Sequence, residues 1–252
     1  MNEVLFELSD SLQAILQDNL VSLILQGSFA VGDFDRDSDV DFTVVTKNEL
    51  SDLEFAALQQ MHFRIFEMES QWARHLEGSY FSEEALLRKP IENEPVWYLD
   101  NTHKTLERSK HDDTPVVRWV MREHGIPLFG AHPKLLINLI APEELKEEVA
   151  VEMQSWKERI FLNPVEMDNR WYQPFAVISY CRMLQTLETG RIESKLSGVK
   201  WGIENLEKRW NGLIERAWRE RPDVSLKVTQ KADSDDFEET FQFILFALEK
   251  IK

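Results

Sequence analysis

The sequence predicts an α+β protein, with a mixed sheet in its first part and a helical bundle in its second. Up to about residue 140, short apolar runs that suit strands are interleaved with helical stretches, whereas from Ala141 onward the pattern is helical throughout. A chain of 252 residues can bury the core of one or two domains. We therefore expect an α/β domain over residues 1–140 and an α-helical domain over residues 141–252.

The first part alternates helices and strands. The short run at residues 21–25, which is rich in β-branched residues, favours a buried strand. Polar and apolar side chains alternate over residues 39–44, which is typical of a half-buried strand. Asp113-Thr114-Pro115 predicts the start of a helix that ends at Gly125. The expected elements are helices 4–17, 50–63 and 115–124 and strands 21–26, 40–46 and 72–81.

The second part is predicted to be all helical. A connector rich in glycine and proline, residues 125–133, precedes it. Ala141-Pro142-Glu143-Glu144 predicts a helix start, with proline in the first position and acids in the first turn. The single cysteine, Cys181, lies among apolar helical neighbours, which predicts core packing. Further helices are expected at 175–187, ending at Gly190, and at 194–206, 210–219 and 237–251.

The chain is strongly acidic, with a formal net charge of −16. Such a surface repels nucleic acid and anionic membranes and attracts a small cation. The sequence has no apolar run of about 18 residues, so we expect no membrane span. Residues 1–20 carry four acidic residues and read as an amphipathic helix rather than a signal peptide. We expect a cytoplasmic monomer or homodimer with no nucleic-acid partner.

The most informative run is residues 26–42, where a Gly-Ser pair follows one strand and an Asp-x-Asp pair enters the next. Gly27 allows a tight turn, and Ser28 adds a hydroxyl where a helical turn with anion-favouring N–H groups begins. On a strand, Asp39 and Asp41 share one face about 7 Å apart. Two such carboxylates suit Mg²⁺, which binds through one or two carboxylates together with substrate phosphates.

A solvated acidic loop over residues 33–37 that only connects two strands is the alternative for this run. The Asp-x-Asp pattern carries little information by itself, because 45 of the 252 residues are acidic. The Gly-Ser pair upstream and the apolar strand that the aspartates enter favour a binding site. The run therefore predicts a phosphate cradle beside a magnesium site.

The same residues resemble the signature of the nucleotidyltransferase superfamily, in Gly27-Ser28, Gly32-Asp33 and Ser38-Asp39-Val40-Asp41. The resemblance implies a nucleotidyltransferase-fold first domain that binds ATP together with Mg²⁺, and we expect two ions. It implies that Asp39, Asp41 and a third carboxylate hold the metal, and that Gly27, Ser28 and Ser38 bind the nucleotide.

In this family the third carboxylate is a strand glutamate that deprotonates the acceptor hydroxyl. Glu77, within residues 74–80, is the best match, although Gly78 stands where the family pattern has a β-branched residue. A positioned general base typically contributes about 10²–10⁴-fold to a rate. Glu67 and Glu69 are rival candidates, and an exposed glutamate on a sheet edge is the structural alternative.

A second stretch, residues 179–195, resembles the C-terminal helical domain of the streptomycin/spectinomycin adenylyltransferases. The two blocks together cover most of the chain. The resemblance implies transfer of AMP from ATP to a hydroxyl of an aminoglycoside, with release of pyrophosphate. Arg182 and Lys195 match basic residues that reach the triphosphate, a suitable partner for a lysine ammonium. An exposed helix lysine is the alternative for Lys195.

The acceptor side departs from the family pattern. Streptomycin-modifying members use an aromatic residue of the first domain, for which Trp97 is the counterpart, and an acidic residue at a helix start in the second. At that second position the chain has an aromatic residue, Tyr172, and Asp168 is the nearby acid. We expect all three to line an acceptor pocket, with ordinary core packing as the alternative for the aromatic residues. Another acceptor, such as a protein hydroxyl or a lincosamide-like drug, and a catalytically silent relative stay open.

Overall fold

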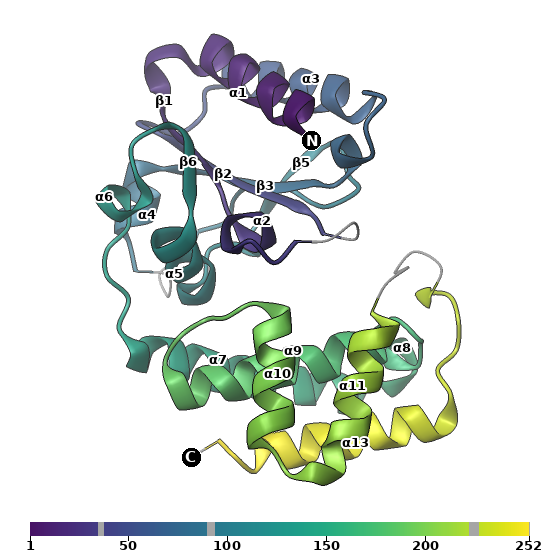
Figure 1. Ribbon diagram of the computed structural model, residues 1–252. Helices are drawn as coiled ribbons and strands as arrows, with labels where there is room; N and C mark the ends of the chain where they lie inside the picture. The colour runs from purple at the N-terminus through teal and green to yellow at the C-terminus, as the bar shows by residue number, and fades with distance from the viewer. Residues whose placement is uncertain (35–37, 90–93, 222–226, 252) are drawn as a thin grey trace. The chain divides into compact units, whose positions relative to one another are not determined.

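The computed structural model describes residues 1–34, 38–89, 94–221 and 227–251. The chain divides into two compact units, Met1–Ile140 and Ala141–Lys252. The first contains one six-stranded sheet with helices, and the described residues of the second form helices and connecting turns (Figure 1). The predicted α+β fold class is therefore confirmed.

The sheet of the first unit has the strand order β5-β4-β3-β2-β1-β6. The central strands β2 and β3 run parallel, and every other neighbouring pair is antiparallel, so the sheet is mixed as predicted. A parallel pair needs a crossover connection, and α3 (Asp52–Phe66) provides it between β2 and β3. The strands are β1 Leu20–Leu25, β2 Val40–Thr46, β3 Leu76–Ser82, β4 Val96–Leu99, β5 Leu106–Ser109 and β6 Ile126–Gly130.

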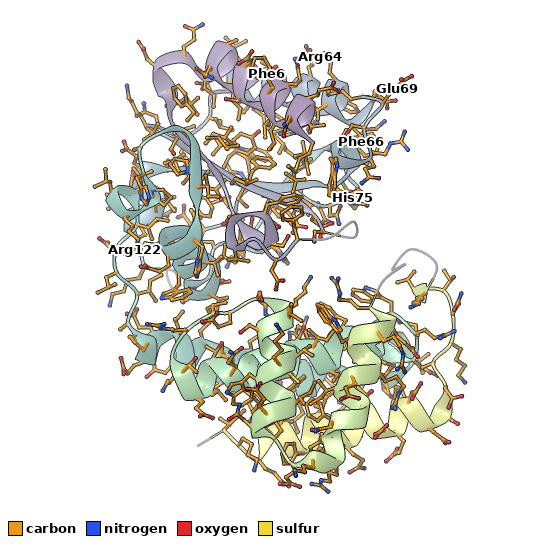
Figure 2. The ribbon with its side chains drawn as sticks, viewed as in Figure 1. Phe6, Arg64, Phe66, Glu69, His75 and Arg122 are labelled. Atoms are coloured by element: carbon orange, nitrogen blue, oxygen red, sulfur yellow. The ribbon has the colours of Figure 1, made fainter. Side chains whose placement is uncertain are left out.

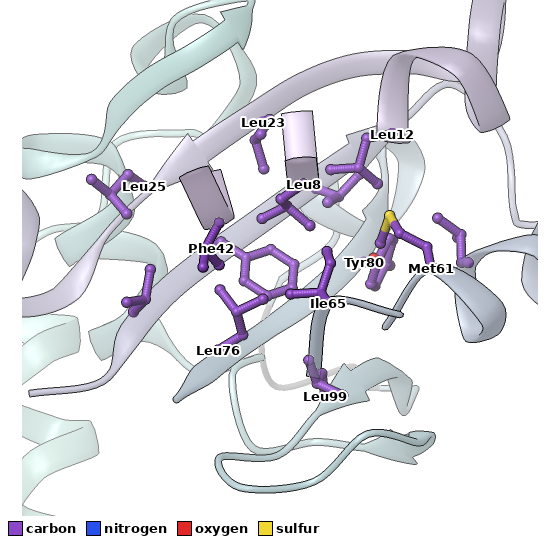
Figure 3. Packing of buried hydrophobic residues seen from close by; sticks show 14 of the residues in the cluster. Leu8, Leu12, Leu23, Leu25, Phe42, Met61, Ile65, Leu76, Tyr80 and Leu99 are labelled. Carbon is purple, nitrogen blue, oxygen red and sulfur yellow. The ribbon is translucent and has the colours of Figure 1, made fainter. Parts of the chain in front are cut away.

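Two packed helices, α1 (Asn2–Leu16) and α3, cover one face of this sheet (Figure 1). α3 begins at a capping box in which Ser51 and Glu54 satisfy each other's backbone N–H groups. The buried positions of α1 recur every four residues, as expected for a helix that packs one stripe against a core. The core between helices and sheet includes Leu8, Leu12, Phe42, Met61, Ile65 and Leu76 (Figure 3).

The opposite face carries a second core and the strand ends that bear the predicted carboxylates. Val45, Phe81 and Met121 are fully buried there. α5 (Pro115–His124) begins as expected, with Thr114 as its capping residue and proline in its first position. α2 (Gly27–Val31) and α5 lie on this side of the sheet, and α4 (Glu83–Leu87) and α6 (Pro133–Leu136) complete the unit (Figure 1).

Two expectations for the first unit are wrong. Residues 71–74 form a 3-10 turn, so β3 begins at Leu76 rather than at residue 72. Residues 126–130 are not a plain connector but the edge strand β6, which pairs with β1. Gly130 has a φ of 76° and packs so closely on β1 that a Cβ atom would lie 2.0 Å from the Val21 carbonyl oxygen. Proline is tolerated in this strand because it lies at the sheet edge.

The second unit packs its helices around α9 (Tyr172–Thr189), which contacts α7, α10, α11 and α13. α9 ends at Gly190 in the left-handed conformation, as expected. Cys181 is fully buried in α9, as predicted, and Gly202 of α10 lets that helix approach it closely. Further helices within the described residues of this unit are α7 Pro142–Leu162, α8 Pro164–Met167, α10 Lys195–Asn205, α11 Asn211–Glu220 and α13 Ser234–Leu248. Among the described residues, no helix has the length and apolar composition of a membrane span.

Candidate active site

Two of the predicted carboxylates lie side by side on the central parallel strands. Asp41 of β2 is the register partner of Glu77 of β3, so the two side chains leave the same face of the sheet from strands about 4.8 Å apart. Val40 and Phe42, the neighbours of Asp41, are fully buried in the core on the other face. Asp39 immediately precedes β2 and lies two residues before Asp41, so an extended backbone places both side chains on the same face of the sheet.

The Gly-Ser turn lies directly against this pair. Gly27 has a φ of 63°, and a Cβ atom at this position would lie 1.8 Å from Oδ2 of Asp41. The Gln26 N–H donates to the Asp41 carbonyl oxygen over 2.9 Å, which ties the end of β1 to β2. Ser28 follows within α2, and Ser38 is buried immediately before Asp39. Residues 35–37, part of the acidic loop considered above, lie outside the described residues.

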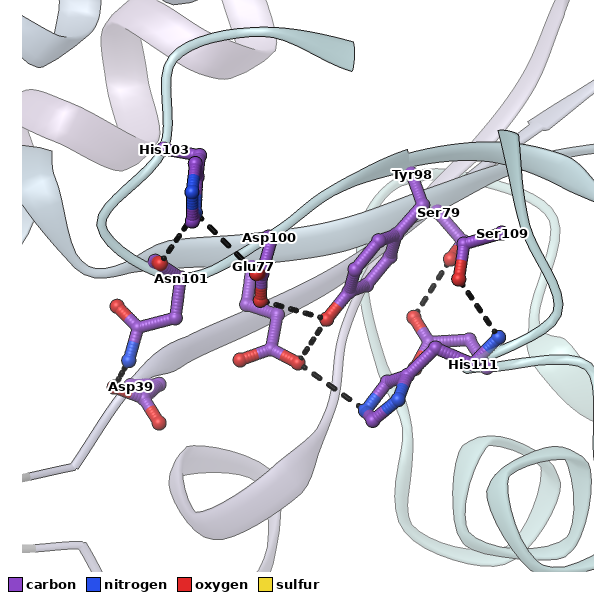
Figure 4. Close-up of polar contacts among 10 residues, drawn as sticks. Asp39, Glu77, Ser79, Tyr98, Asp100, Asn101, His103, Ser109 and His111 are labelled. Atoms are coloured by element: carbon purple, nitrogen blue, oxygen red, sulfur yellow. Dashed lines mark hydrogen bonds and ion pairs between the residues drawn. The ribbon is translucent and has the colours of Figure 1, made fainter. Parts of the chain in front are cut away.

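Glu77 of β3 contacts the side chains of Tyr98 and His111 (Figure 4). The Tyr98 hydroxyl donates to its Oε1 over 2.6 Å, and Nε2 of His111 lies 3.6 Å from the same oxygen. Burial raises the pKa of Glu77, the nearby Asp112 and Asp39 raise it further, and the Tyr98 hydrogen bond opposes them. A carboxylate with a raised pKa is a better proton acceptor near neutral pH.

The rival bases lie elsewhere. Glu67 follows the last residue of α3 and forms an exposed ion pair with Lys104 over 3.6 Å. Glu69 is exposed at the outer edge of the first unit, beyond the end of α3 (Figure 2). Neither pairs in register with Asp41, and the arrangement of the strands therefore favours Glu77.

Asp39 is oriented by a turn that follows β4. The Asn101 side-chain amide donates to Oδ1 of Asp39 over 2.5 Å, and Nδ1 of His75 lies 3.7 Å from that oxygen. Thr102, next to Asn101, has a φ of 65°, an uncommon conformation for a β-branched residue. Strained backbone of this kind persists where the surroundings fix it, and it is concentrated at functional sites.

Two further polar residues of this cluster, His111 and Asp112, were not predicted from any sequence pattern. Asp112 is buried, and its Oδ2 accepts a hydrogen bond from the Ser79 hydroxyl over 2.7 Å. Burial raises the pKa of Asp112. One potential ligand atom from each of Glu77, His111 and Asp112 lies within 4.8 Å of the others. These residues meet through the registers of β4 against β3 and of β5 against β4, which no local sequence pattern specifies.

The carboxylate oxygens at the ends of β2 and β3 suit Mg²⁺, which prefers oxygen ligands and usually binds through one or two carboxylates. Asp41 and Glu77 are register partners, and because Gly27 has no side chain, the Asp41 carboxylate can lie directly against the backbone of the Gly-Ser turn. The carboxylates of Asp39 and Asp112 disfavour ionisation of Glu77, a repulsion that a cation would reverse. The residues present therefore fit a magnesium site.

Trp97, predicted on the acceptor side, does not lie with the carboxylates. It pairs with Tyr80 on the face covered by α3, where its ring packs 4.3 Å from that of Phe55 and under the Arg108 guanidinium. A one-residue difference in strand parity explains this, because the adjacent Tyr98 is the residue that faces Glu77.

The remaining predicted residues belong to the second unit. Arg182 of α9 donates from Nε to the Glu193 carbonyl oxygen over 3.0 Å, and burial lowers its pKa. Lys195 is exposed as the first residue of α10. Asp168 ends α8 and pairs with Lys231 over 3.4 Å. Tyr172 is buried, and burial raises its pKa to about 12.

Both parts of the chain match known protein families. Residues 7–95 match the nucleotidyltransferase domain, and residues 136–245 match the C-terminal domain of aminoglycoside adenylyltransferases. Together the two matches take in most of the sequence. The first lies within the unit Met1–Ile140, and the second begins at residue 136, shortly before the unit boundary.

Individual proteins show the same similarity. A spectinomycin 9-adenylyltransferase of Campylobacter jejuni is 25% identical over 215 residues, which are 81% of this chain and 79% of the relative. A crystal structure of the spectinomycin adenyltransferase AAD(9) from Enterococcus faecialis, with ATP and spectinomycin, has a TM-score of 0.71 at 18% identity. It covers 99% of this chain and is itself covered completely, and at this identity it shows a shared fold.

Proposed function

We propose that this chain, an aminoglycoside adenylyltransferase-like member of the nucleotidyltransferase superfamily, transfers AMP from ATP to a hydroxyl of a spectinomycin-class aminoglycoside. The observation that carries the proposal is the register pairing of Asp41 with Glu77 beside the tight turn at Gly27. This arrangement would bring together a metal-binding carboxylate, a base and a closely approaching backbone at the ends of the two central strands.

The chemistry follows from the residues of the first unit. Asp39 and Asp41 would hold Mg²⁺, which when bound neutralises phosphate charge. The backbone at Gly27 and Ser28, with Ser38, would bind phosphate oxygens. Glu77 takes the proton of the acceptor hydroxyl, whose oxygen forms a bond to the α-phosphorus of ATP. The bond from the α-phosphorus to the β-phosphate oxygen breaks, and pyrophosphate leaves. Positioning supplies much of the rate in such reactions.

The second unit would contribute to both substrates. We assign Arg182 and Lys195 to the triphosphate, in line with the residues that they match in the helical domain of this family. Asp168 and Tyr172 are the candidates for the acceptor. Spectinomycin is favoured over streptomycin because Tyr172 stands where streptomycin-modifying members carry an acid, and because the two relatives described above are named for spectinomycin. A cytoplasmic location, where ATP is available, goes with this activity.

The test is incubation of the protein with ATP, Mg²⁺ and spectinomycin or streptomycin, followed by mass spectrometry of the drug. We expect an AMP adduct on spectinomycin. Glu77→Gln should abolish the adduct, whereas Glu67→Gln, which changes an exposed glutamate of the same unit, should retain it.

Absence of an adduct on every aminoglycoside tried would overturn the acceptor assignment. Label from ATP that appears on a protein or on another small molecule would then identify the true acceptor class. Calorimetry would identify a catalytically silent relative. In that case ATP binding would be undetectable, or it would be insensitive to Mg²⁺ and to Asp39→Asn.

A further inference from the structure

We propose that Glu77, His111 and Asp112 form a binding site for a transition-metal cation such as Zn²⁺ or Co²⁺, adjacent to the Mg²⁺ ligands Asp39 and Asp41. The three side chains come from β3 and from the loop that follows β5, and one ligand atom of each lies within 4.8 Å of the others. In a tetrahedral zinc site the ligand atoms are about 3.4 Å apart. Small side-chain movements would therefore close the site around an ion.

Each of the three ligands is held by a neighbour that would support metal binding. The Ser79 hydroxyl donates to Asp112 over 2.7 Å, and the Tyr98 hydroxyl donates to Glu77 over 2.6 Å. The Tyr98 ring also packs against the imidazole of His111, with the ring centroids 5.3 Å apart (Figure 4). Hydrogen bonds to ligating carboxylates orient them toward a metal and are a regular feature of metal sites.

The donor set decides which cation is preferred. Asp39 and Asp41 offer only oxygen, which suits Mg²⁺, whereas an imidazole nitrogen favours first-row transition metals. The exposure of the three proposed ligands decreases from His111, whose side chain is 63% exposed, to Glu77, at 18%, and to Asp112, which is buried. A cation would reach the carboxylates from the exposed His111 side.

Occupation of this site has a functional consequence, and this part rests on the proposed function. A metal ion bound to Glu77 uses the carboxylate oxygens that would accept the proton of the acceptor hydroxyl. Zn²⁺ should therefore inhibit AMP transfer. Excess Mg²⁺ should not restore activity, because Mg²⁺ is a poor competitor for a site that contains an imidazole.

Metal binding is tested on the full chain without ATP or Mg²⁺. Titration calorimetry with Zn²⁺, and the visible absorption of bound Co²⁺, should show one site in the wild type. His111→Gln should weaken this binding by roughly tenfold or more, and Asp112→Asn should do the same. His103→Gln is the matched control, because His103 is similarly exposed, at 60%, and its Nδ1 lies 3.3 Å from Oδ2 of Asp100, outside the cluster of three ligands. Its affinity for Zn²⁺ should equal that of the wild type.

The proposal is overturned if the wild type binds no Zn²⁺, if His111→Gln binds it equally well, or if His103→Gln loses as much affinity. Because His111 is exposed, its replacement should not disturb the fold, and the result does not depend on whether Asp112→Asn is stable. The inhibition measurement compares each variant with its own activity without Zn²⁺, and His111→Gln should resist inhibition. If the chain transfers no AMP, the binding measurements alone still decide the metal site.

Discussion

The buried histidine of the first unit predicts a loss of stability in acid. His62 of α3 is 2% exposed, and its Nε2 shares a hydrogen bond of 2.6 Å with the Tyr80 hydroxyl of β3. Its Nδ1 is buried and has no hydrogen-bond partner among the described residues, so a second proton would be placed on an unpaired group. Burial accordingly lowers the pKa of His62 to about 3.

The sign and size of the effect follow from linkage. In the unfolded chain the imidazole titrates near its ordinary pKa of 6.5, whereas in the folded unit it stays neutral down to about pH 3. The stability that depends on neutral His62 is complete above pH 6.5, and it is lost as the pH falls from 6.5 toward 3. At about pH 5, roughly 1.5 pH units below the unfolded-state pKa, the loss amounts to about 2 kcal/mol.

The assay compares the wild type with a His62→Phe/Tyr80→Phe variant, which replaces both hydrogen-bonding partners so that neither is left unpaired. Hydrogen exchange of the β2 and β3 amide groups at neutral pH and at about pH 5 reports the opening free energy of the first unit. The wild type should lose about 2 kcal/mol more than the variant. His103→Gln, at an exposed site, should behave as the wild type. Equal acid dependence in the wild type and the double variant would refute the reasoning.

Three further substitutions test the candidate active site and the buried contacts that support the first unit. Tyr98→Phe removes the hydroxyl that donates to Glu77, and a hydrogen bond to a charged group is worth about 1.5–3 kcal/mol, so kcat/KM should fall about 10- to 100-fold. Calorimetry should show unchanged ATP affinity in this variant, and unaltered turnover would contradict a positioning role. Gly27→Ala places a Cβ atom against the Asp41 carboxylate at a positive φ and should abolish Mg²⁺-dependent ATP binding, as calorimetry would show. Arg118→Met removes a buried guanidinium that donates to a carboxylate and to three backbone carbonyls, and denaturation should show a loss of about 3–5 kcal/mol; a change below 1 kcal/mol would exclude a supporting role.

Local sequence was sufficient to locate the carboxylates. The alternation in residues 39–44 placed Val40 and Phe42 in the core and Asp41 on the other face, and the structure has that arrangement. Caps also marked helix ends reliably, as at Pro115 and Gly190. Each of these features depends on neighbours within a few residues, which is the range over which a sequence pattern carries direct information.

The partners of the carboxylates could not be predicted in the same way. Asn101 lies 62 residues from Asp39, and Tyr98 lies 21 residues from Glu77. Their meeting depends on the antiparallel register of β4 against β3, which no local pattern specifies. Trp97 lies away from the carboxylates for the same reason, since a shift of β4 by one residue would exchange the faces of Trp97 and Tyr98. The edge strand β6 was missed because its glycine and proline residues resemble those of a connector.

Different strands and loops of the sheet contribute different groups to the candidate site. The inner parallel strands carry Asp41 and Glu77. β4 and the loops that follow β4 and β5 carry the groups that donate hydrogen bonds to the carboxylates or repel them electrostatically. A fold built for stability alone gains nothing from placing Glu77 near Asp39 and Asp112, because burial and mutual repulsion raise its pKa. A bound cation would offset both the burial of the Glu77 carboxylate and its repulsion by Asp39 and Asp112. Burial, by raising the pKa of Glu77, also makes it a stronger base. This electrostatic cost at the ends of β2 and β3 agrees with the metal site proposed above and with the proposed role of Glu77 as a base.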